Sequence, residues 1–144
     1  METSKILQGG IAGGVTFFLL GWLVYGILLS DYSAANYNQC AAKPMEDMVW
    51  WALMLSNLAF GFLISIVFSW SNSKGAMDGA KVGGIIGLLV ALSIDLSIFS
   101  MSNMFSNFSV VLVDIIVYSV MAAIAGLVVA LVMGMGKKET FQKN

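Results

Sequence analysis

The sequence has few of the residues on which most enzyme chemistry depends. It contains no arginine, no histidine and a single cysteine, Cys40, and charged residues make up 10% of its 144 positions. The lack of histidine excludes Ser-His-Asp triads, histidine acid–base catalysis and zinc sites of the Cys/His type, and the lack of arginine excludes bidentate clamps on phosphate. The seven lysines are spread along the chain and form no basic patch for nucleic acid. We therefore expect a protein that is not an enzyme, carries no metal or organic cofactor and binds no nucleic acid.

Apolar residues, in contrast, make up 59% of the chain. A soluble domain carries about 25% charged residues, so this composition indicates a protein that resides in the lipid bilayer. Four long apolar segments cover residues 6–29, 48–70, 82–101 and 110–133. Each reaches the length of about 20 residues that a helix needs to cross about 30 Å of hydrocarbon. The sequence thus predicts an all-α fold, a single domain over residues 1–144 that forms an up-down bundle of four transmembrane helices.

The lysines predict how this bundle is oriented. Six of the seven fall on the side that carries both chain ends, and the opposite side holds Lys43 alone. The six are Lys5, Lys74, Lys81, Lys137, Lys138 and Lys143. Because loops rich in lysine remain on the cytoplasmic side, we expect both termini in the cytoplasm.

Small residues recur at every fourth position along the third and fourth segments. The helix-packing stripes are Gly75, Gly79, Gly83 and Gly87 in the third segment and Ala122, Gly126, Ala130 and Gly134 in the fourth. Residues four apart share one face of a helix, and small residues there let transmembrane helices approach closely. We expect the two stripes to pack against each other, antiparallel. A phosphate cradle is disfavoured, because a helix buried in lipid has no free backbone N–H groups there.

A weaker version of the pattern in the first two segments suggests an internal repeat. Gly9, Gly13 and Gly14 match Gly79, Gly83 and Gly84 at one constant offset, and Asn57, Gly61, Ser65 and Ser69 parallel Asp114, Tyr118, Ala122 and Gly126. Such a repeat would relate two parallel helical hairpins by a pseudo-twofold axis along the membrane normal. Chance matches are common among glycine-rich apolar helices, so the repeat stays an open interpretation.

Two acidic residues, Asp95 and Asp114, lie inside the third and fourth segments. Ionisable residues within a membrane are costly, face the bundle interior and often mark an ion, proton or ligand site. Two adjacent carboxyl groups would share a proton or hold a cation between them. The residues that could donate a hydrogen bond to this ligand or ion site are Asn57, Tyr25, Tyr118 and Trp22. The competing interpretation is that the acids only fix helix register, with Tyr25 and Trp22 as interface anchors.

Methionines in the predicted outer loops form a second group near Cys40. Met45 and Met48 are one pair, and Met101 and Met104 are another. Thioethers and thiolates suit Cu(I), but methionine is also a flexible packing residue, so we expect no metal site. Cys40 either forms an intermolecular disulfide or is a free thiol, and the sequence does not decide between the two.

The stretch Gly21-Trp22-Leu23-Val24-Tyr25-Gly26 resembles a family of small bacterial four-helix membrane proteins known as a domain of unknown function, typified by a Gly-Trp-x-x-Tyr motif in its first helix. The stretches 57–61 and 113–114 are also similar, and the likeness extends from about residue 9 to residue 134. The resemblance implies a multi-pass protein of the bacterial inner membrane. It implies no activity, substrate or catalytic residue.

Two functional hypotheses remain after these exclusions. The favoured one is a binding or transport module for a cation, a proton or a small amphiphile that uses the two acids. The alternative is a non-catalytic structural or accessory subunit of a larger membrane complex. An enzyme acting on lipid would need an activated nucleophile, and the sequence shows none. The lone proline, Pro44, interrupts none of the helices, which weakens the case for a transporter without excluding it, because transporters often build binding sites from broken helices. Four helices enclose little space, so we expect a homo-oligomer or a membrane-protein partner, with the ligand unidentified.

Overall fold

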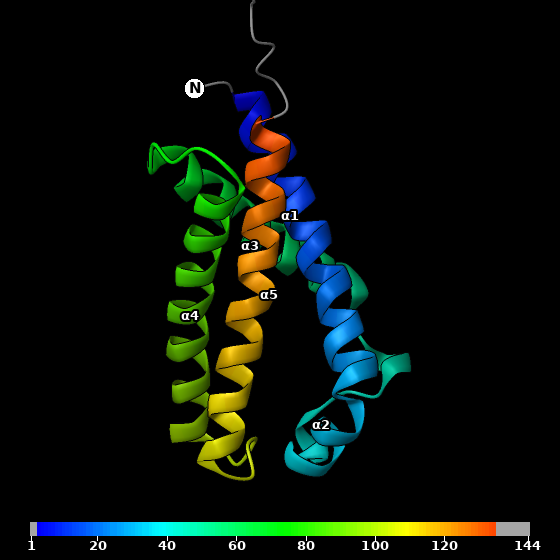
Figure 1. The fold of residues 1–144 in the computed structure, drawn as a ribbon. Coiled ribbons are helices and arrows are strands. Elements are labelled where there is room, and N and C mark those ends of the chain that lie inside the picture. Colours follow the sequence, from blue (N-terminus) through cyan, green and yellow to red (C-terminus); the bar gives the residue numbers. More distant parts are fainter. Residues whose placement is uncertain (1–2, 135–144) are drawn as a thin grey trace, which may run out of the picture.

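The computed structural model, which describes residues 3–134, is a bundle of antiparallel helices (Figure 1). Its four long helices are α1 (Thr3–Leu23, extended by the π-helix η1, Val24–Leu28), α3 (Trp50–Trp70), α4 (Ala76–Met101) and α5 (Phe108–Gly134). All four are long and apolar enough to cross a membrane. No strand occurs in the described range, so the predicted all-α four-helix membrane bundle is confirmed.

The connections are more ordered than the sequence predicts. Between η1 and α3 the chain forms a short helix, α2 (Ser30–Asn36), and two 3-10 turns, η2 (Gln39–Ala41) and η3 (Met45–Asp47). Helix α4 begins at Ala76, six residues before the predicted boundary at residue 82. Its start follows Gly75, whose φ of 108° breaks the helical path, and the Asp78 side chain accepts a hydrogen bond from the backbone N–H of Lys74 at 3.2 Å.

Helix α5 lies at the centre of the bundle. It runs beside α4 along its whole length and also packs against α1, while α1 packs against α3 (Figure 1). Ala122, Ala125 and Val129 on α5 are completely buried. The outward faces of all four long helices carry exposed large apolar side chains, as contact with lipid requires.

Each of the two helix pairs crosses at one glycine. A Cβ atom on Gly61 of α3 would overlap the backbone of Gly10 and Gly14 in α1. A Cβ atom on Gly126 of α5 would overlap the carbonyl oxygen of Gly79 and lie 2.9 Å from the Cα of Gly83 in α4. Backbones therefore touch at both crossings, where any larger residue would push the helices apart.

Two members of the predicted packing stripes, Gly75 and Gly134, lie at the ends of the helices and away from the close contacts. A Cβ atom on either glycine would meet nothing within 4 Å, because Gly75 lies in the turn before α4 and Gly134 is the last residue of α5. The contacts also change the register of the possible repeat. Gly61 lies at the α1–α3 crossing and Gly126 at the α4–α5 crossing, so the contacts make these two glycines equivalent. The repeat read from the sequence instead makes Gly61 equivalent to Tyr118.

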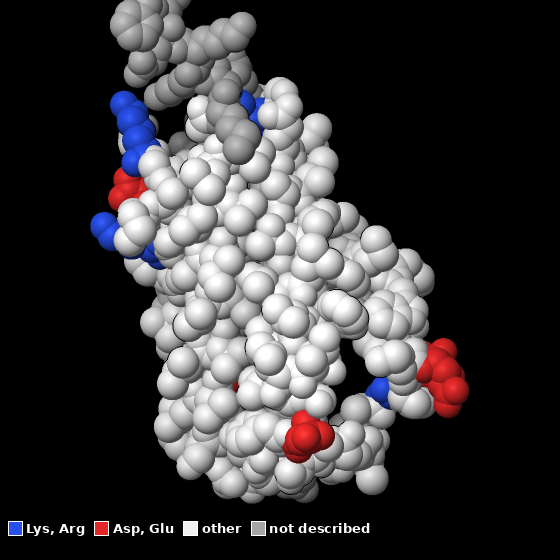
Figure 2. All heavy atoms as spheres, turned by 45° about the vertical axis from the view of Figure 1, so that its right-hand side comes forward, with Lys and Arg blue, Asp and Glu red and all other residues white. Residues whose placement is uncertain are grey.

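Charged side chains gather at the two ends of the face seen in Figure 2, with a nearly uncharged zone between them. We call the end that contains residues 3–8, 69–81 and 130–134 the terminal end, and the end formed by residues 29–49 and 102–107 the cap end. Within the described residues, the terminal end has three lysines and one acid, and the cap end has one lysine and three acids. The predicted cytoplasmic residues Lys137, Lys138 and Lys143 lie outside the described range.

Candidate functional site

The two membrane-embedded acids lie at the same depth, close to the cap end. Asp95 is six residues before the end of α4, and Asp114 is six residues after the start of α5. At 1.5 Å per residue, both are about 9 Å from the ends of their helices. The close pairing of α4 with α5 brings the two carboxyl groups within hydrogen-bonding reach of each other.

Asp114 is held by two tyrosines from separate parts of the chain. Its Oδ1 accepts a hydrogen bond from the Tyr25 hydroxyl at 2.7 Å and another from the Tyr37 hydroxyl at 2.6 Å. Tyr25 belongs to the π-helical turn η1, a type of distortion that often occurs at functional sites. The Asp114 carboxylate therefore fixes both α1 and the cap end to α5.

Asp95 has less support. Its side chain is 6% exposed, and its Oδ2 atom is buried without a hydrogen-bond donor among the described residues. Contact with Asp114 is a hydrogen bond only if one of the two carboxyl groups carries a proton. Two ionised carboxylates at this spacing would repel each other strongly, so the pair needs a shared proton or a cation.

Backbone pairing holds the cap end against the bundle. Tyr37 and Phe105 form an isolated antiparallel bridge, and the Asn38 N–H donates to the Met104 carbonyl at 2.8 Å. The Tyr37 and Phe105 rings also pack together, with centroids 5.3 Å apart. These contacts direct the Tyr37 side chain toward Asp114. Burial and the hydrogen bond to Asp114 both raise the pKa of Tyr37 above its ordinary value, so this hydroxyl remains a donor.

A cavity of about 450 Å³ opens beside the two acids. Its lining combines the carboxyl groups with aromatic rings, polar groups of the cap end and no lysine: Tyr25, Ser33, Tyr37, Asn38, Gln39, Ala42, Asp95, Ile98, Met104, Phe105, Asp114 and Tyr118. The Ser33 Oγ is buried and makes no hydrogen bond with the described part of the chain. The cavity can therefore offer a ligand two carboxyl groups and a hydroxyl beside aromatic surface.

The structure unites four of the six predicted site residues, namely Asp95, Asp114, Tyr25 and Tyr118. Asn57 and Trp22 do not belong to the site. The Asn57 amide donates to the Leu53 carbonyl of its own helix at 2.7 Å, and Trp22 is 57% exposed.

The sequence reasoning missed the cap residues, above all Tyr37. No periodicity marks residue 37, because it lies in a connection rather than on a helix face. Two tyrosines in this short polar segment, Tyr32 and Tyr37, were the one available signal. Of the predicted outer-loop methionines, Met104 lines the cavity, while Met45 and Met101 are highly exposed.

The chain matches no protein-family model, no curated protein and no solved structure. The resemblance of the first helix to a family of small four-helix membrane proteins therefore stays a prediction. The site itself has to carry the functional argument.

Proposed function

We propose that the protein is a small membrane module that binds a proton or a small cation at the Asp95–Asp114 pair. The cavity beside the pair also admits a cation with an apolar part, so a small cationic amphiphile belongs to the same ligand class. The proposal covers transport of this ligand as well as binding, through a homo-oligomer or with a membrane-protein partner. It carries no catalytic step.

The observation that carries the proposal is the environment of Asp95. A buried carboxyl oxygen without a donor, in contact with a second carboxyl group, costs free energy unless positive charge compensates it. No lysine lines the cavity among residues 3–134, so this part of the chain supplies no such charge there. A proton or an external cation would provide it.

The resemblance of the first helix to small bacterial membrane proteins favours a location in a bacterial inner membrane, and the distribution of lysines favours an orientation with the terminal end in the cytoplasm. The described terminal end carries Lys5, Lys74 and Lys81, against Lys43 at the cap end. In this orientation the acid pair lies in the outer half of the bilayer, and ligand would reach it from outside through the cap.

A second candidate function rests on the tyrosine contacts. Because Tyr25 and Tyr37 both donate to Asp114, this carboxylate ties together α1, the cap and α5. A residue of this kind also suits a structural or accessory subunit that contributes helices to a larger membrane complex. In that case Asp114 would stabilise the fold without binding a ligand.

Ligand-dependent stability distinguishes the two functions. The detergent-purified protein is unfolded by heat across pH and in a panel of monovalent, divalent and organic ammonium cations. A ligand that binds only the folded state at a hundredfold excess over its Kd adds about 2.7 kcal/mol. The variants are Asp95→Asn and Asp95→Asn/Asp114→Asn. Asp78→Asn is the matched control, since Asp78 lies at the terminal end in an ion pair with Lys81 at 3.9 Å.

The binding function predicts that one cation, or one pH step, stabilises the wild type and Asp78→Asn but not the Asp95 variants. The side-chain amide introduced by Asp95→Asn could still donate to Asp114, so this variant is expected to remain folded. Equal responses in all four proteins would refute the ligand site. The accessory subunit would be favoured if Asp95→Asn is as stable as the wild type, responds to cations and pH as the wild type does, and co-purifies with a larger complex.

A further inference from the structure

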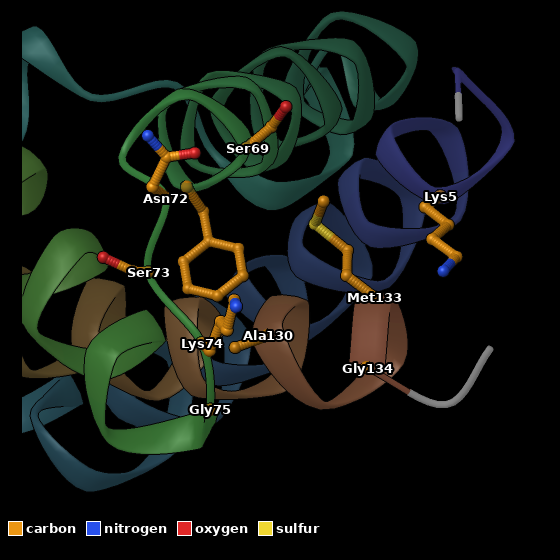
Figure 3. Close-up of a pocket in the computed structure, with 10 residues that line it drawn as sticks. Lys5, Ser69, Asn72, Ser73, Lys74, Gly75, Ala130, Met133 and Gly134 are labelled. Atoms are coloured by element: carbon orange, nitrogen blue, oxygen red, sulfur yellow. The ribbon is translucent and has the colours of Figure 1, made fainter. Parts of the chain in front are cut away.

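A second cavity, of about 730 Å³, lies at the terminal end, far along the bundle from the acid pair. It is bounded by the first turns of α1, the end of α3, the α3–α4 connection and the end of α5 (Figure 3). The function proposed above makes no use of it.

The lining of this cavity has an apolar part and a polar, basic part. Phe68, Ala130 and Met133 supply the apolar surface. Lys74 stands at the polar side with Asn72, Ser69 and Ser73, and Lys5 projects from α1 on the opposite side (Figure 3). Among the described residues, no acid lines the cavity. A ligand that fits both parts has an anionic group and a hydrocarbon portion.

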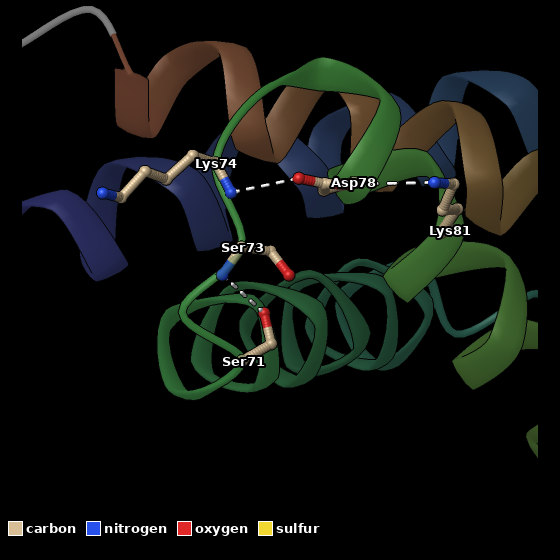
Figure 4. A network of polar contacts seen from close by, with 5 residues as sticks. All are labelled: Ser71, Ser73, Lys74, Asp78 and Lys81. Carbon is tan, nitrogen blue, oxygen red and sulfur yellow. Dashed lines mark hydrogen bonds and ion pairs between the residues drawn. The ribbon is translucent and has the colours of Figure 1, made fainter.

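The nearest acid of the connection does not neutralise Lys74. The Asp78 carboxylate pairs with Lys81 at 3.9 Å and accepts the backbone N–H of Lys74 at 3.2 Å. The Lys74 side chain runs away from Asp78 on the other side of the connection (Figure 4). Within the described residues, the Lys74 ammonium group has no ion pair.

The backbone of the connection sets this arrangement. Asn72 has a φ of 52° and Gly75 a φ of 108°. These two positive φ values turn the backbone before and after Ser73 and Lys74. The Ser73 N–H donates to the Ser71 Oγ at 3.4 Å, which closes the turn over the end of α3 (Figure 4). Ser73 and Lys74 are thereby held at the rim of the cavity.

We propose that this cavity binds an anionic phospholipid, with the phosphate at Lys74 and Ser73 and one acyl chain against Phe68 and Met133. Lys5 adds positive charge at the opposite wall. The terminal end of a four-helix membrane bundle lies at headgroup depth, where basic pockets between helices bind anionic headgroups. A soluble phosphate shares the headgroup chemistry but would leave the apolar part of the lining unused.

The test measures binding of short-chain lipids to the delipidated, detergent-purified protein by native mass spectrometry. The probes are dioctanoyl phosphatidylglycerol, dioctanoyl phosphatidylcholine and glycerol 3-phosphate. Lys74→Gln removes the proposed phosphate ligand. Lys81→Gln is the matched control, since it removes one lysine from the same end but outside the cavity lining. Gly134→Phe adds a ring to the lining of the cavity, at a position where a Cβ atom would meet nothing within 4 Å.

Phosphatidylglycerol is expected to bind the wild type and Lys81→Gln alike. Lys74→Gln should bind it about fivefold more weakly, which is the contribution of one lysine at an anionic membrane surface. Gly134→Phe should also bind more weakly, with all three lysines of this end intact. Equal losses in both lysine variants, or equal binding of phosphatidylcholine, would overturn the proposal. Binding of glycerol 3-phosphate as strong as that of the lipid would replace the lipid by a soluble phosphate and overturn it too.

Discussion

A single oxygen atom, Oδ1 of Asp114, receives two tyrosine hydroxyls from segments that precede it by 89 and 77 residues. Tyr25 anchors the end of the first membrane helix, and Tyr37 anchors the cap. The two bonds differ in their surroundings, because Tyr25 lies within a membrane span and Tyr37 outside one. Removing the Tyr37 hydroxyl therefore tests how the cap is attached, and removing the Tyr25 hydroxyl tests how α1 is held against α5.

Tyr37→Phe tests the attachment of the cap. The change removes one hydrogen bond and leaves the Tyr37–Phe105 ring contact in place. We expect the free energy of unfolding to fall by about 1–2 kcal/mol, as for a bond to a charged acceptor at a half-buried position. Thermal or denaturant unfolding in detergent measures this difference. An unchanged stability would show that the bond does not hold the cap in solution.

The same variant carries a pH signature. Because burial and the Asp114 bond raise the pKa of Tyr37, the folded protein keeps this proton more tightly than the unfolded chain, whose tyrosine titrates at its ordinary value of 10.0. The stabilisation is complete below about pH 9 and is lost as pH rises above about 10. The stability gap between wild type and Tyr37→Phe should therefore narrow at alkaline pH. The titratable groups near this hydroxyl are Asp114, Asp95, Tyr32 and Tyr25.

The chemistry of single residues pointed to the two acids but not to all of the side chains that surround them. Asp95 and Asp114 stand out in the sequence because a charge inside an apolar run is costly. Asn57 shares that polarity, yet a bond to its own helix satisfies its amide. Tyr37 reaches the site through a bridge to Phe105, a contact across 68 residues that no local pattern encodes.

At the scale of elements, the long apolar runs predicted the four helices of the bundle, and the fourfold spacing of small residues is the sequence basis for expecting the third and fourth to pack closely. Lipid forces every backbone group into a helix, so length and hydropathy fix the number and course of the long helices. Local geometry was not predictable in this way. The π-helical turn over Val24–Leu28 carries the Tyr25 hydroxyl that donates to Asp114 in α5, and the last residue of α2, Asn36, accepts the N–H of Ser106 through its carbonyl. No local sequence pattern marks either contact.

Two neighbouring glycines in α4 allow a matched test of the close contact between α4 and α5. A Cβ atom on Gly83 would overlap the Ala122 carbonyl oxygen, whereas one on Gly84 would lie 3.4 Å from the Ala123 Cβ, an ordinary contact. Gly83→Ala should destabilise the bundle by about 1–3 kcal/mol through overpacking. Gly84→Ala should be neutral or gain up to about 1 kcal/mol from higher helix propensity. Unfolding of both variants in detergent is the measurement, and equal effects would contradict the close α4–α5 contact.

The whole molecule is polarised along the membrane normal. The cavity at the terminal end is lined by two lysines and the cavity at the cap end by two acids, so the two proposals assign them ligands of opposite charge. Under the proposed orientation, the lysine-lined cavity faces the cytoplasm and the acid pair faces outside. The orientation of the bundle therefore decides from which side of the membrane each ligand would arrive.

The lone cysteine provides a direct test of that orientation. Cys40 lies in η2 at the cap end and is exposed as a free thiol. With the cap outside, a membrane-impermeant maleimide should label Cys40 in intact cells as fully as in permeabilised ones. The control is a Cys40→Ser/Ser73→Cys variant, which moves the thiol to the terminal end and should be labelled only after permeabilisation. The reverse pattern would invert the bundle, and the acid pair would then take its ligand from the cytoplasm.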